Sequence, residues 1–546
     1  MSSAIVRLLF TFTLLGAVPA SAHDAAPAAA AVSGALDSGL SRLHHRVSTR
    51  NPKAQAHFDQ GMRLVFAFNH AAAIESFRQA LALDPDLAMA HWGIALALGP
   101  NINLPMDAAA HQAAYAAVQL ALRLKAKASP IEREYIDALS RRYAANPDAD
   151  TGPLQVAYKD AMKELYRRHP QDTDAAVLYA ESLMDLHPWK LWAPDGKPAE
   201  GTLELTQVLE RAMRQQRDHI GALHYYIHAV EASPHPERAL AAVKRLEGLA
   251  PSAGHLVHMP AHIYIRTGNY IDAIRVNESA ARADERLAAS GARSFYLVAY
   301  YGHNLHFLAV CNAIAGNFAG AIAAANKLYA HASPMIKEIP PLDGFLYTPA
   351  MVLAKFERWD DILALPEPAF EAPISGVVWR LARTLALAGK GRLVDAAAER
   401  AKFVEATASL PKNLELGNNN AGSLVAIAGP YLDGRIALMR GNFAESIRYL
   451  REAVAAEDML AYDEPTPWYL PSREALGAAQ LRAGDFAGAE KTFRDDLAHN
   501  PESGRSLFGL HAALRAAGRS EEAATAQARF ERAWRAADVK LGAPSL

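Results

Sequence analysis

The chain has 546 residues, of which 51% are hydrophobic, 8% aromatic and 21% charged, and its formal net charge is −2. This length exceeds one ordinary domain core, so we expect several domains or one elongated repeat array. The balanced charge, without clusters of Lys and Arg, excludes the electrostatic footprint of a nucleic-acid-binding groove. The single cysteine, Cys311, excludes an intramolecular disulfide, and we expect its thiol to be buried and unreactive.

The first 22 residues have the layout of a cleavable secretory signal peptide. Arg7 precedes an apolar run from Leu8 to Val18, and the small residues of a cleavage site end at Ala22. No later stretch has roughly 18 uninterrupted apolar residues, so we expect no membrane insertion of the mature chain. A periplasmic or secreted protein is therefore expected. Residues 23–48 are small and lack a hydrophobic period, which predicts a flexible linker.

Two segments, one near each end of the remaining chain, share a spacing of Gly, Ala, a large apolar residue and Pro that is typical of a helix–turn–helix repeat. The first is AQAHFDQGMRLVFAFNHAAAIESFRQALALDP, with Gly61, Ala73, Phe77, Ala80 and Pro85. The second is SREALGAAQLRAGDFAGAEKTFRDDLAHNP, with Gly477, Ala489, Phe493 and Pro501. The small residues let two helices approach, the large apolar residue fills the gap beside them, and Pro stops the second helix.

This spacing resembles the tetratricopeptide repeat (TPR) family over residues 50–535. The resemblance implies an all-α TPR superhelix, or α-solenoid, which we divide into an N-terminal array (49–332) and a C-terminal array (333–546). The central repeats are irregular, and Leu104–Pro130 is interpreted as an insertion. Three segments are also similar to large exported bacterial TPR proteins, a resemblance that implies no activity: AHWGIALALGPNIN, ESLMDLHPWKLW and YDEPTPWYLPSREALG.

Histidines recur at the repeat period in the middle of the chain. His224 and His228 are followed by His258 and His262 at the same spacing (258 − 224 = 262 − 228 = 34). Because 34 residues is the TPR period, these imidazoles are expected at equivalent places on neighbouring helices.

A second alignment extends the series to the next repeat. Matching GNYIDAI to GNFAGAI gives an offset of 48 (321 − 273 = 48), which relates His255 to His303 and His258 to His306. The positions that carry these histidines and Glu231 are three or four residues apart, so they form one stripe on a helix. In the TPR family this stripe lines a concave groove, and the resemblance therefore implies that the imidazoles face a cavity.

These histidines predict a transition-metal site. Side chains of neighbouring helices, whose axes lie roughly 8–10 Å apart, can converge on one ion. Nitrogen ligands without thiolates suit copper or zinc, our first choices for an exported protein, with iron as a further candidate. The number of histidines exceeds what one ion needs, so two ions are considered. The predicted ligands are His224, His228, His255, His258, His262, His303 and His306.

Two carboxylates are the candidate catalytic groups. Glu231 follows the first histidine pair as HxxxHxxE and is predicted either as a ligand or as the acceptor that fixes an imidazole tautomer. Glu181 is expected to face the groove and to form one wall of a pocket with Asp185 and Trp189, and the alternative is a structural acidic helix face. The motif lacks the glutamate of HExxH, so a zincin protease is not supported.

Two functions remain open at this point. In the first, an exported TPR solenoid binds the metal and acts as a metal-dependent enzyme or a metal-handling protein, with a small molecule in the groove. In the second, a metal-free scaffold of the cell envelope holds an extended peptide or another protein in the same groove. A third reading is that repeat duplication copied the histidines without creating a site. The sequence assigns no oligomeric state.

Overall fold

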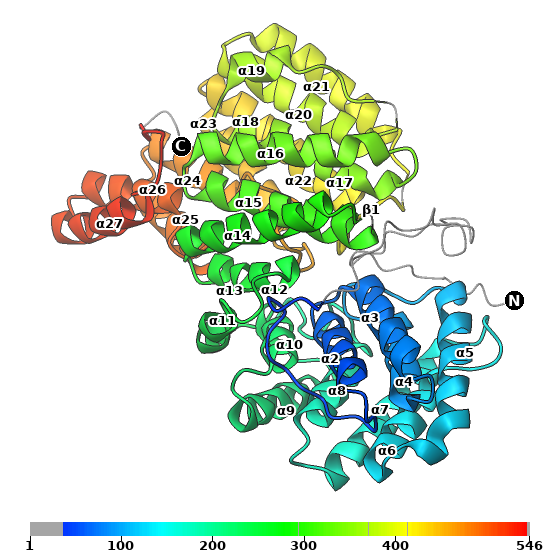
Figure 1. Ribbon diagram of the computed structural model, residues 1–546. Helices are drawn as coiled ribbons and strands as arrows, with labels where there is room; N and C mark the ends of the chain where they lie inside the picture. The colour runs from blue at the N-terminus through cyan, green and yellow to red at the C-terminus, as the bar shows by residue number, and fades with distance from the viewer. Residues whose placement is uncertain (1–35, 293, 370, 412, 543–546) are drawn as a thin grey trace, which may run out of the picture. The chain divides into compact units, whose positions relative to one another are not determined.

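The computed structural model describes residues 36–292, 294–369, 371–411 and 413–542. The predicted signal peptide (1–22) and the first part of the predicted linker (23–35) lie outside the described residues. The described chain forms two compact units (Figure 1). The first unit contains the chain up to Ile263 together with Glu278–Tyr301, and the second contains Tyr264–Asn277 and Gly302–Leu546.

Helices make up most of the first unit. They are α2 (Pro52–Phe66), α3 (His70–Leu83), α4 (Ala88–Leu98), α5 (Ala108–Leu124), α6 (Pro130–Leu139), α7 (Thr151–Arg168), α8 (Thr173–Met184), α9 (Thr202–Gln215), α10 (Ile220–Val230), α11 (Leu240–Leu246) and α12 (Gly254–His258). Two helices, α13 (Pro260–Arg266) and α14 (Tyr270–Ala289), are divided between the units, and a π-helical turn spans Leu297–Tyr301.

The second unit is also helical. It contains α15 (Gly302–Ile314), α16 (Phe318–Ala332), α17 (Asp343–Leu346), α18 (Thr348–Lys355), α19 (Trp359–Ala364), α20 (Pro373–Gly389), α21 (Leu393–Ala408), α22 (Ala421–Met439), α23 (Phe443–Glu457), α24 (Ser472–Arg482), α25 (Phe486–His499), α26 (Gly504–Ala516) and α27 (Ser520–Ala533). A two-residue hairpin, β1 (Glu415–Leu416) and β2 (Asn419–Asn420), precedes α22, with Glu415 paired to Asn420. None of the helices in the described ranges is long and apolar enough to cross a membrane.

Consecutive helices pack against each other as pairs in both units. The pairs include α2 with α3, α4 with α5, α22 with α23, and α26 with α27. This arrangement, with almost no strand in the described chain, confirms the predicted all-α fold built from TPR-type helix pairs. The border between the compact units differs from the predicted border at residue 332, because α16 packs against α18 of the second unit.

Phe77 shows why the repeat motif produces these pairs. A Cβ atom added to Gly61 on α2 or to Gly93 on α4 would lie 2.4 or 2.6 Å from the Phe77 ring, so both glycines are needed for the ring to fit between the helices. Phe493 repeats this contact near the other end of the chain, where Cβ atoms at Gly477 and Gly509 would lie 2.5 and 2.2 Å from its ring.

The predicted insertion at Leu104–Pro130 is wrong. Residues 108–124 of this segment form α5, which pairs with α4 as a regular member of the stack. The segment is rich in Ala, and Ala114, Val118 and Ala121 supply the apolar stripe that packs against the neighbouring helix.

The described part of the predicted flexible linker, residues 36–48, is anchored to the first unit. Leu40, Leu43 and Val47 are buried, and the carbonyl oxygen of Leu43 accepts a hydrogen bond from Arg63 Nε at 2.8 Å. His45 Nδ1 lies 2.6 Å from Asp174 Oδ2 on α8. Apolar side chains and His45 therefore attach this segment to the first unit, although its small residues suggested a flexible linker.

Candidate metal centre

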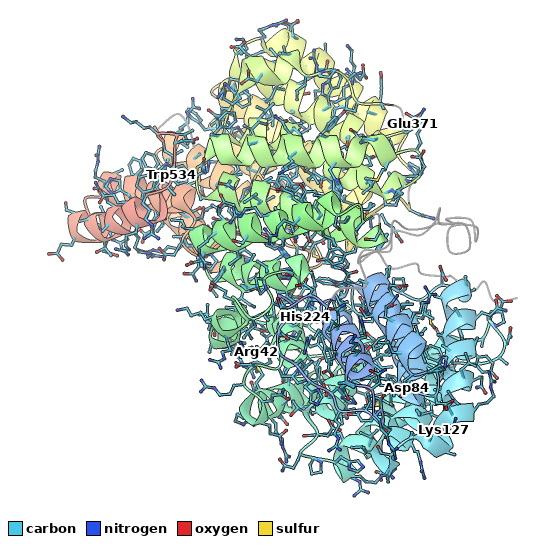
Figure 2. All side chains as sticks on the ribbon, viewed as in Figure 1. Arg42, Asp84, Lys127, His224, Glu371 and Trp534 are labelled. Atoms are coloured by element: carbon cyan, nitrogen blue, oxygen red, sulfur yellow. The ribbon has the colours of Figure 1, made fainter. Side chains whose placement is uncertain are left out.

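Helix α10 carries the first two predicted ligands. The side chain of His219 caps this helix by accepting the N–H of Ala222 at 3.1 Å, and the helix ends just before Glu231. His224 and His228 lie four residues apart within it and therefore project from the same side. Both imidazoles are buried, with 0% and 2% of their surface exposed. Figure 2 labels the buried His224 together with Arg42 and Lys127, which are exposed residues of the same unit.

His255 reaches the same point from α12. This helix begins at Gly254, where an added Cβ would lie 2.0 Å from Asp284 Oδ1, so only glycine fits. The backbone N–H of His255 donates to Tyr296 Oη at 2.8 Å, and the Tyr296 hydroxyl lies 3.3 Å from Asp284 Oδ1. These contacts fix the start of the helix and the direction of the His255 side chain.

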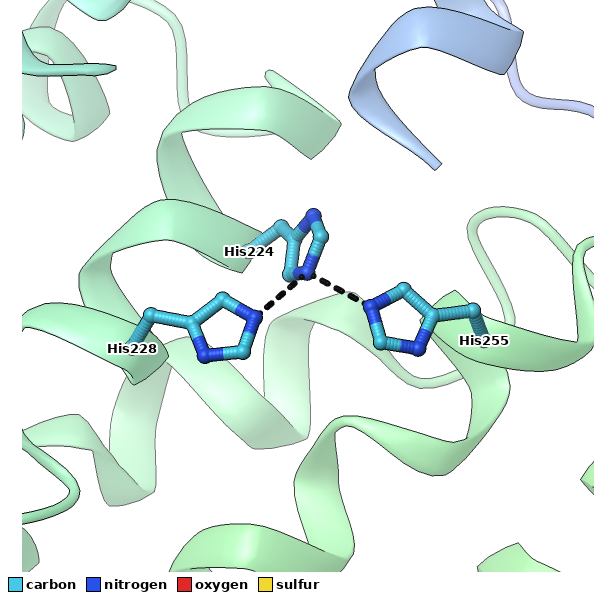
Figure 3. Close-up of side chains that lie close together, drawn as sticks. All are labelled: His224, His228 and His255. Atoms are coloured by element: carbon cyan, nitrogen blue, oxygen red, sulfur yellow. Dashed lines mark hydrogen bonds between the residues drawn. The ribbon is translucent and has the colours of Figure 1, made fainter. Parts of the chain in front are cut away.

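Three imidazole nitrogens converge between α10 and α12. His224 Nε2 lies 3.1 Å from His228 Nε2 and 3.1 Å from His255 Nε2, as the dashed lines in Figure 3 show. These three ligand atoms all lie within 4.8 Å of one another. We call His224, His228 and His255 the histidine triad.

The outer nitrogens of two triad members have fixed partners. His224 Nδ1 lies 2.7 Å from the carbonyl oxygen of Phe66, and His228 Nδ1 lies 2.8 Å from Glu231 Oε1. Both partners only accept hydrogen bonds, so each Nδ1 carries the proton. In a neutral ring Nε2 then presents its lone pair to the centre of the triad, as in metal-ligating histidines.

The facing lone pairs of His224 and His228 need a positive charge between them. At 3.1 Å they repel unless a proton or a metal ion is shared. Nitrogens bound at ~2.0–2.1 Å to a tetrahedral ion are about 3.3–3.4 Å apart, close to the two distances of 3.1 Å that His224 Nε2 makes within the triad. The donor set of three buried imidazoles therefore fits a transition-metal ion.

Burial favours the neutral form of two triad members, His224 and His255. Removal from water, followed by the neighbouring His228 ring, lowers the pKa of His224 well below its usual value. Burial and the ring of His224 have the same effect on the pKa of His255. The His255 Nδ1 atom is buried and has no hydrogen-bond partner among the described residues. Neutral imidazoles are the form that binds metal ions.

Glu231 connects the triad to a second pair of imidazoles, His258 and His262. Its Oε2 lies 2.7 Å from His262 Nδ1, while its Oε1 holds His228. The Nε2 atoms of His258 and His262 lie 2.7 Å apart. Burial would raise the pKa of Glu231, but the adjacent His228 and His262 rings hold it below its usual value. Glu231 thus contacts two imidazoles, the geometry of a carboxylate that fixes imidazole tautomers, and the ligand atoms of His228, Glu231 and His262 also lie within 4.8 Å of one another.

The expectation that the imidazoles line an open groove is wrong. His224, His228, His255, His258 and His262 are each at most 2% exposed. Aromatic rings cover them: the Phe68 ring centroid lies 4.5, 5.9 and 5.4 Å from those of His224, His228 and His255. Tyr300 packs on His255 at 4.6 Å, and Trp189 meets the His228 ring edge-on at 6.0 Å. Sequence reasoning singled out Trp189 but missed Phe68.

The carboxylate of Glu181, the second candidate catalytic group, pairs with the buried Arg142. Glu181 Oε1 accepts from Arg142 Nη1 at 3.2 Å, and Asp185 Oδ2 accepts from Arg142 Nη2. Glu181 Oε2 and Asp185 Oδ1 are buried without a donor among the described residues. One proton shared by the two carboxyl groups would give both atoms a partner, so this cluster is better described as an ion pair with a carboxyl–carboxylate contact than as a free catalytic acid.

The remaining predicted ligands, His303 and His306, lie on α15 in the second unit. His306 Nε2 is hydrogen bonded to the hydroxyl of Tyr469, and burial lowers the pKa of His306 to about 3. His303 packs edge-on against Phe307 at 5.2 Å. Cys311, on the same helix, is fully buried as expected, and burial raises the pKa of its thiol.

The helix pairs and their Gly–Phe contacts define the class of protein, an all-α protein of TPR type. No protein-family model and no curated protein matches the chain. Solved structures similar to it include the human IFIT1 dimer with m7Gppp-AAAA (13% identity, 89% of this chain and 91% of that chain, TM-score 0.33). Others are yeast Tom70 (12%, 88% and 91%, 0.29) and the TPR domain of P58(IPK) (12%, 86% and 99%, 0.20). At these TM-scores the superpositions carry no argument, so the class rests on the chain's own packing.

Proposed function

We propose that this chain is an exported metal-dependent enzyme whose first unit binds a transition-metal ion through the Nε2 atoms of His224, His228 and His255. The observation that carries the proposal is that the Nε2 atoms of His224 and His228 face each other at 3.1 Å, while the Nδ1 atom of each ring lies against an oxygen that accepts hydrogen bonds. Glu231 supports the site from outside by holding His228.

Copper and zinc are the favoured ions, with iron as a further candidate, because the ligands are imidazoles without thiolates. Three protein ligands leave a fourth position for water or substrate, which is the arrangement of catalytic rather than structural zinc sites. A bound ion would supply Lewis acidity or an activated water at that position.

Burial of the triad favours this proposal over a peptide-binding scaffold. An extended peptide needs an accessible surface, whereas the imidazoles are at most 2% exposed and covered by aromatic rings. A small molecule is therefore the proposed partner of the centre. The proposed location, periplasmic or secreted, is supported by the signal-like residues 1–22.

Metal titration of wild type and His224→Gln tests the proposal. Gln fills most of the volume of the imidazole, which matters because the site is buried and Ala would leave a cavity. We expect the wild type to bind Zn²⁺ or Cu²⁺ at micromolar concentration or tighter, and the variant to bind more than ~100-fold more weakly. His499→Gln, at the exposed end of α25, should bind like wild type. If neither protein purified from its native compartment nor titrated protein binds copper, zinc or iron, the proposal is wrong.

A further inference from the structure

The turn before α3 has a backbone conformation that is unfavourable for the residue type found there. In six helix pairs of the described chain, the residue two positions before the second helix has positive φ and is glycine, namely Gly268, Gly316, Gly391, Gly441, Gly484 and Gly518. The next N–H bonds a carbonyl oxygen five residues back, as from Asn317 to Asn312 at 3.0 Å. This is the glycine-favouring end of a helix.

Phe68 occupies the same position between α2 and α3. Its φ is 57°, and the N–H of Asn69 bonds Leu64 O at 3.0 Å, which shows that the turn is equivalent to the others. A bulky side chain in the left-handed region is strained, and such strain tends to persist where the side chain performs a function. Backbone preference therefore does not account for a phenylalanine here.

The contacts of the Phe68 ring supply a reason. The ring contacts all three triad members, is nearly parallel to the imidazoles of His228 (18°) and His255 (23°), and is only 4% exposed. Its closest approach is to His224, at 4.5 Å between centroids. Trp189, whose φ of 60° is also left-handed, meets the same His228 ring edge-on.

We propose that Phe68 is a positioning residue of the metal centre, which holds the three ligand rings and limits the open coordination position to small exogenous ligands. This inference rests on the proposed function. A left-handed turn residue does not by itself mark a site, because Glu357 has φ 54° in the equivalent turn before α19 and its carboxylate accepts a hydrogen bond from Arg435. The ring stacked on the triad distinguishes Phe68 from Glu357.

Phe68→Gly is the informative variant, because it removes the aromatic ring and at the same time relieves the backbone strain at this left-handed position. With Cu²⁺ as the probe, we expect the variant to bind the ion but with a shifted visible and EPR spectrum. Transfer of copper to EDTA should be at least ~10-fold faster, and azide should bind more tightly, since the ring no longer restricts the open position. Phe68→Tyr keeps the ring and should behave like wild type.

Glu357→Gly is the matched control, since it makes the same backbone change in the second unit and should leave spectrum, copper transfer and azide binding unchanged. If Phe68→Gly does not fold, Phe68→Leu replaces it, because Leu keeps apolar volume without an aromatic ring, and the same changes are expected. Spectrum, transfer rate and azide affinity equal to wild type in the folded variant would overturn the inference. Wild type that binds no metal would instead overturn the proposed function, and this inference with it.

Discussion

His224 shows how single contacts decide the chemistry of the centre. Its Nδ1 atom is hydrogen bonded to the carbonyl oxygen of Phe66, 158 residues away in sequence, and its Nε2 atom faces the imidazoles of His228 and His255. The repeat period predicted that His224, His228 and Glu231 share a face. It could not predict which ring nitrogen carries the proton, because that depends on a carbonyl group from a distant helix.

Glu231→Gln tests the role of the outer carboxylate. A carboxylate accepts from both His228 and His262, whereas the amide of Gln presents a donor to one of them. We expect metal affinity to fall about 10- to 100-fold without loss of the fold. Isothermal titration with Zn²⁺ measures this change. Glu237→Gln is the control, since Glu237 also pairs with a histidine, His235, but at an exposed site; equal affinities for both variants would contradict the assigned role.

Asp185→Asn tests the carboxyl–carboxylate contact. Burial and the Glu181 carboxylate raise the pKa of Asp185 well above 3.8, outweighing Arg142. The folded state then holds a proton that the unfolded chain releases, so wild-type stability falls as pH rises above about 4. Asn does not titrate, and the stability of the variant relative to wild type should therefore be greater at pH 7 than at pH 4.

Urea unfolding at both pH values measures the Asp185 effect. Asp195→Asn serves as the comparison, because Lys197 lowers the pKa of this exposed carboxyl and the expected pH trend is opposite and smaller. A stability difference between Asp185→Asn and wild type that is the same at pH 4 and pH 7 would show that no proton is held at this site.

Helix pairs were the most predictable elements. Gly61, Phe77, Gly477 and Phe493 identify them because two backbones and one ring must share a confined space, which few residue types allow. The segment 36–48 was predicted incorrectly, since its anchoring depends on partners such as Asp174 that lie far along the chain. Phe68 was missed although the sequence contains a signal: the dipeptide Phe68-Asn69 stands where the equivalent turns have Gly followed by Asn, Asp or Arg.

The anchoring of this N-terminal segment should depend on pH. Burial would lower the pKa of His45, but the adjacent Asp174 carboxylate outweighs it and raises the pKa above 6.5. The contribution of the pair to stability is therefore complete below pH 6.5 and is lost as pH rises through the folded-state pKa. We expect tryptic cleavage at Arg42 and Arg46, both exposed, to increase from pH 6.5 to higher pH after correction for trypsin activity.

His45→Gln separates this effect from general loosening of the chain. The variant cannot form the charged pair, so cleavage should be faster than in wild type at pH 6.5 and should lose its pH dependence. An unchanged pH profile in the variant would mean that His45 does not control the anchoring.

At the scale of the whole molecule, each compact unit carries part of the predicted histidine series. The repeat alignments relate His255 and His258, in the first unit, to His303 and His306, in the second. The triad and Glu231 are complete within the first unit, so the proposed function requires only residues of that unit.

The most direct test of the central claim is anomalous X-ray diffraction from crystals of the full chain grown with Zn²⁺ or Cu²⁺, recorded at the absorption edge of the metal. The account predicts a peak bounded by the Nε2 atoms of His224, His228 and His255, at ~2.0–2.1 Å from each nitrogen. Protein crystallised at saturating metal with no peak among these three imidazoles would contradict it.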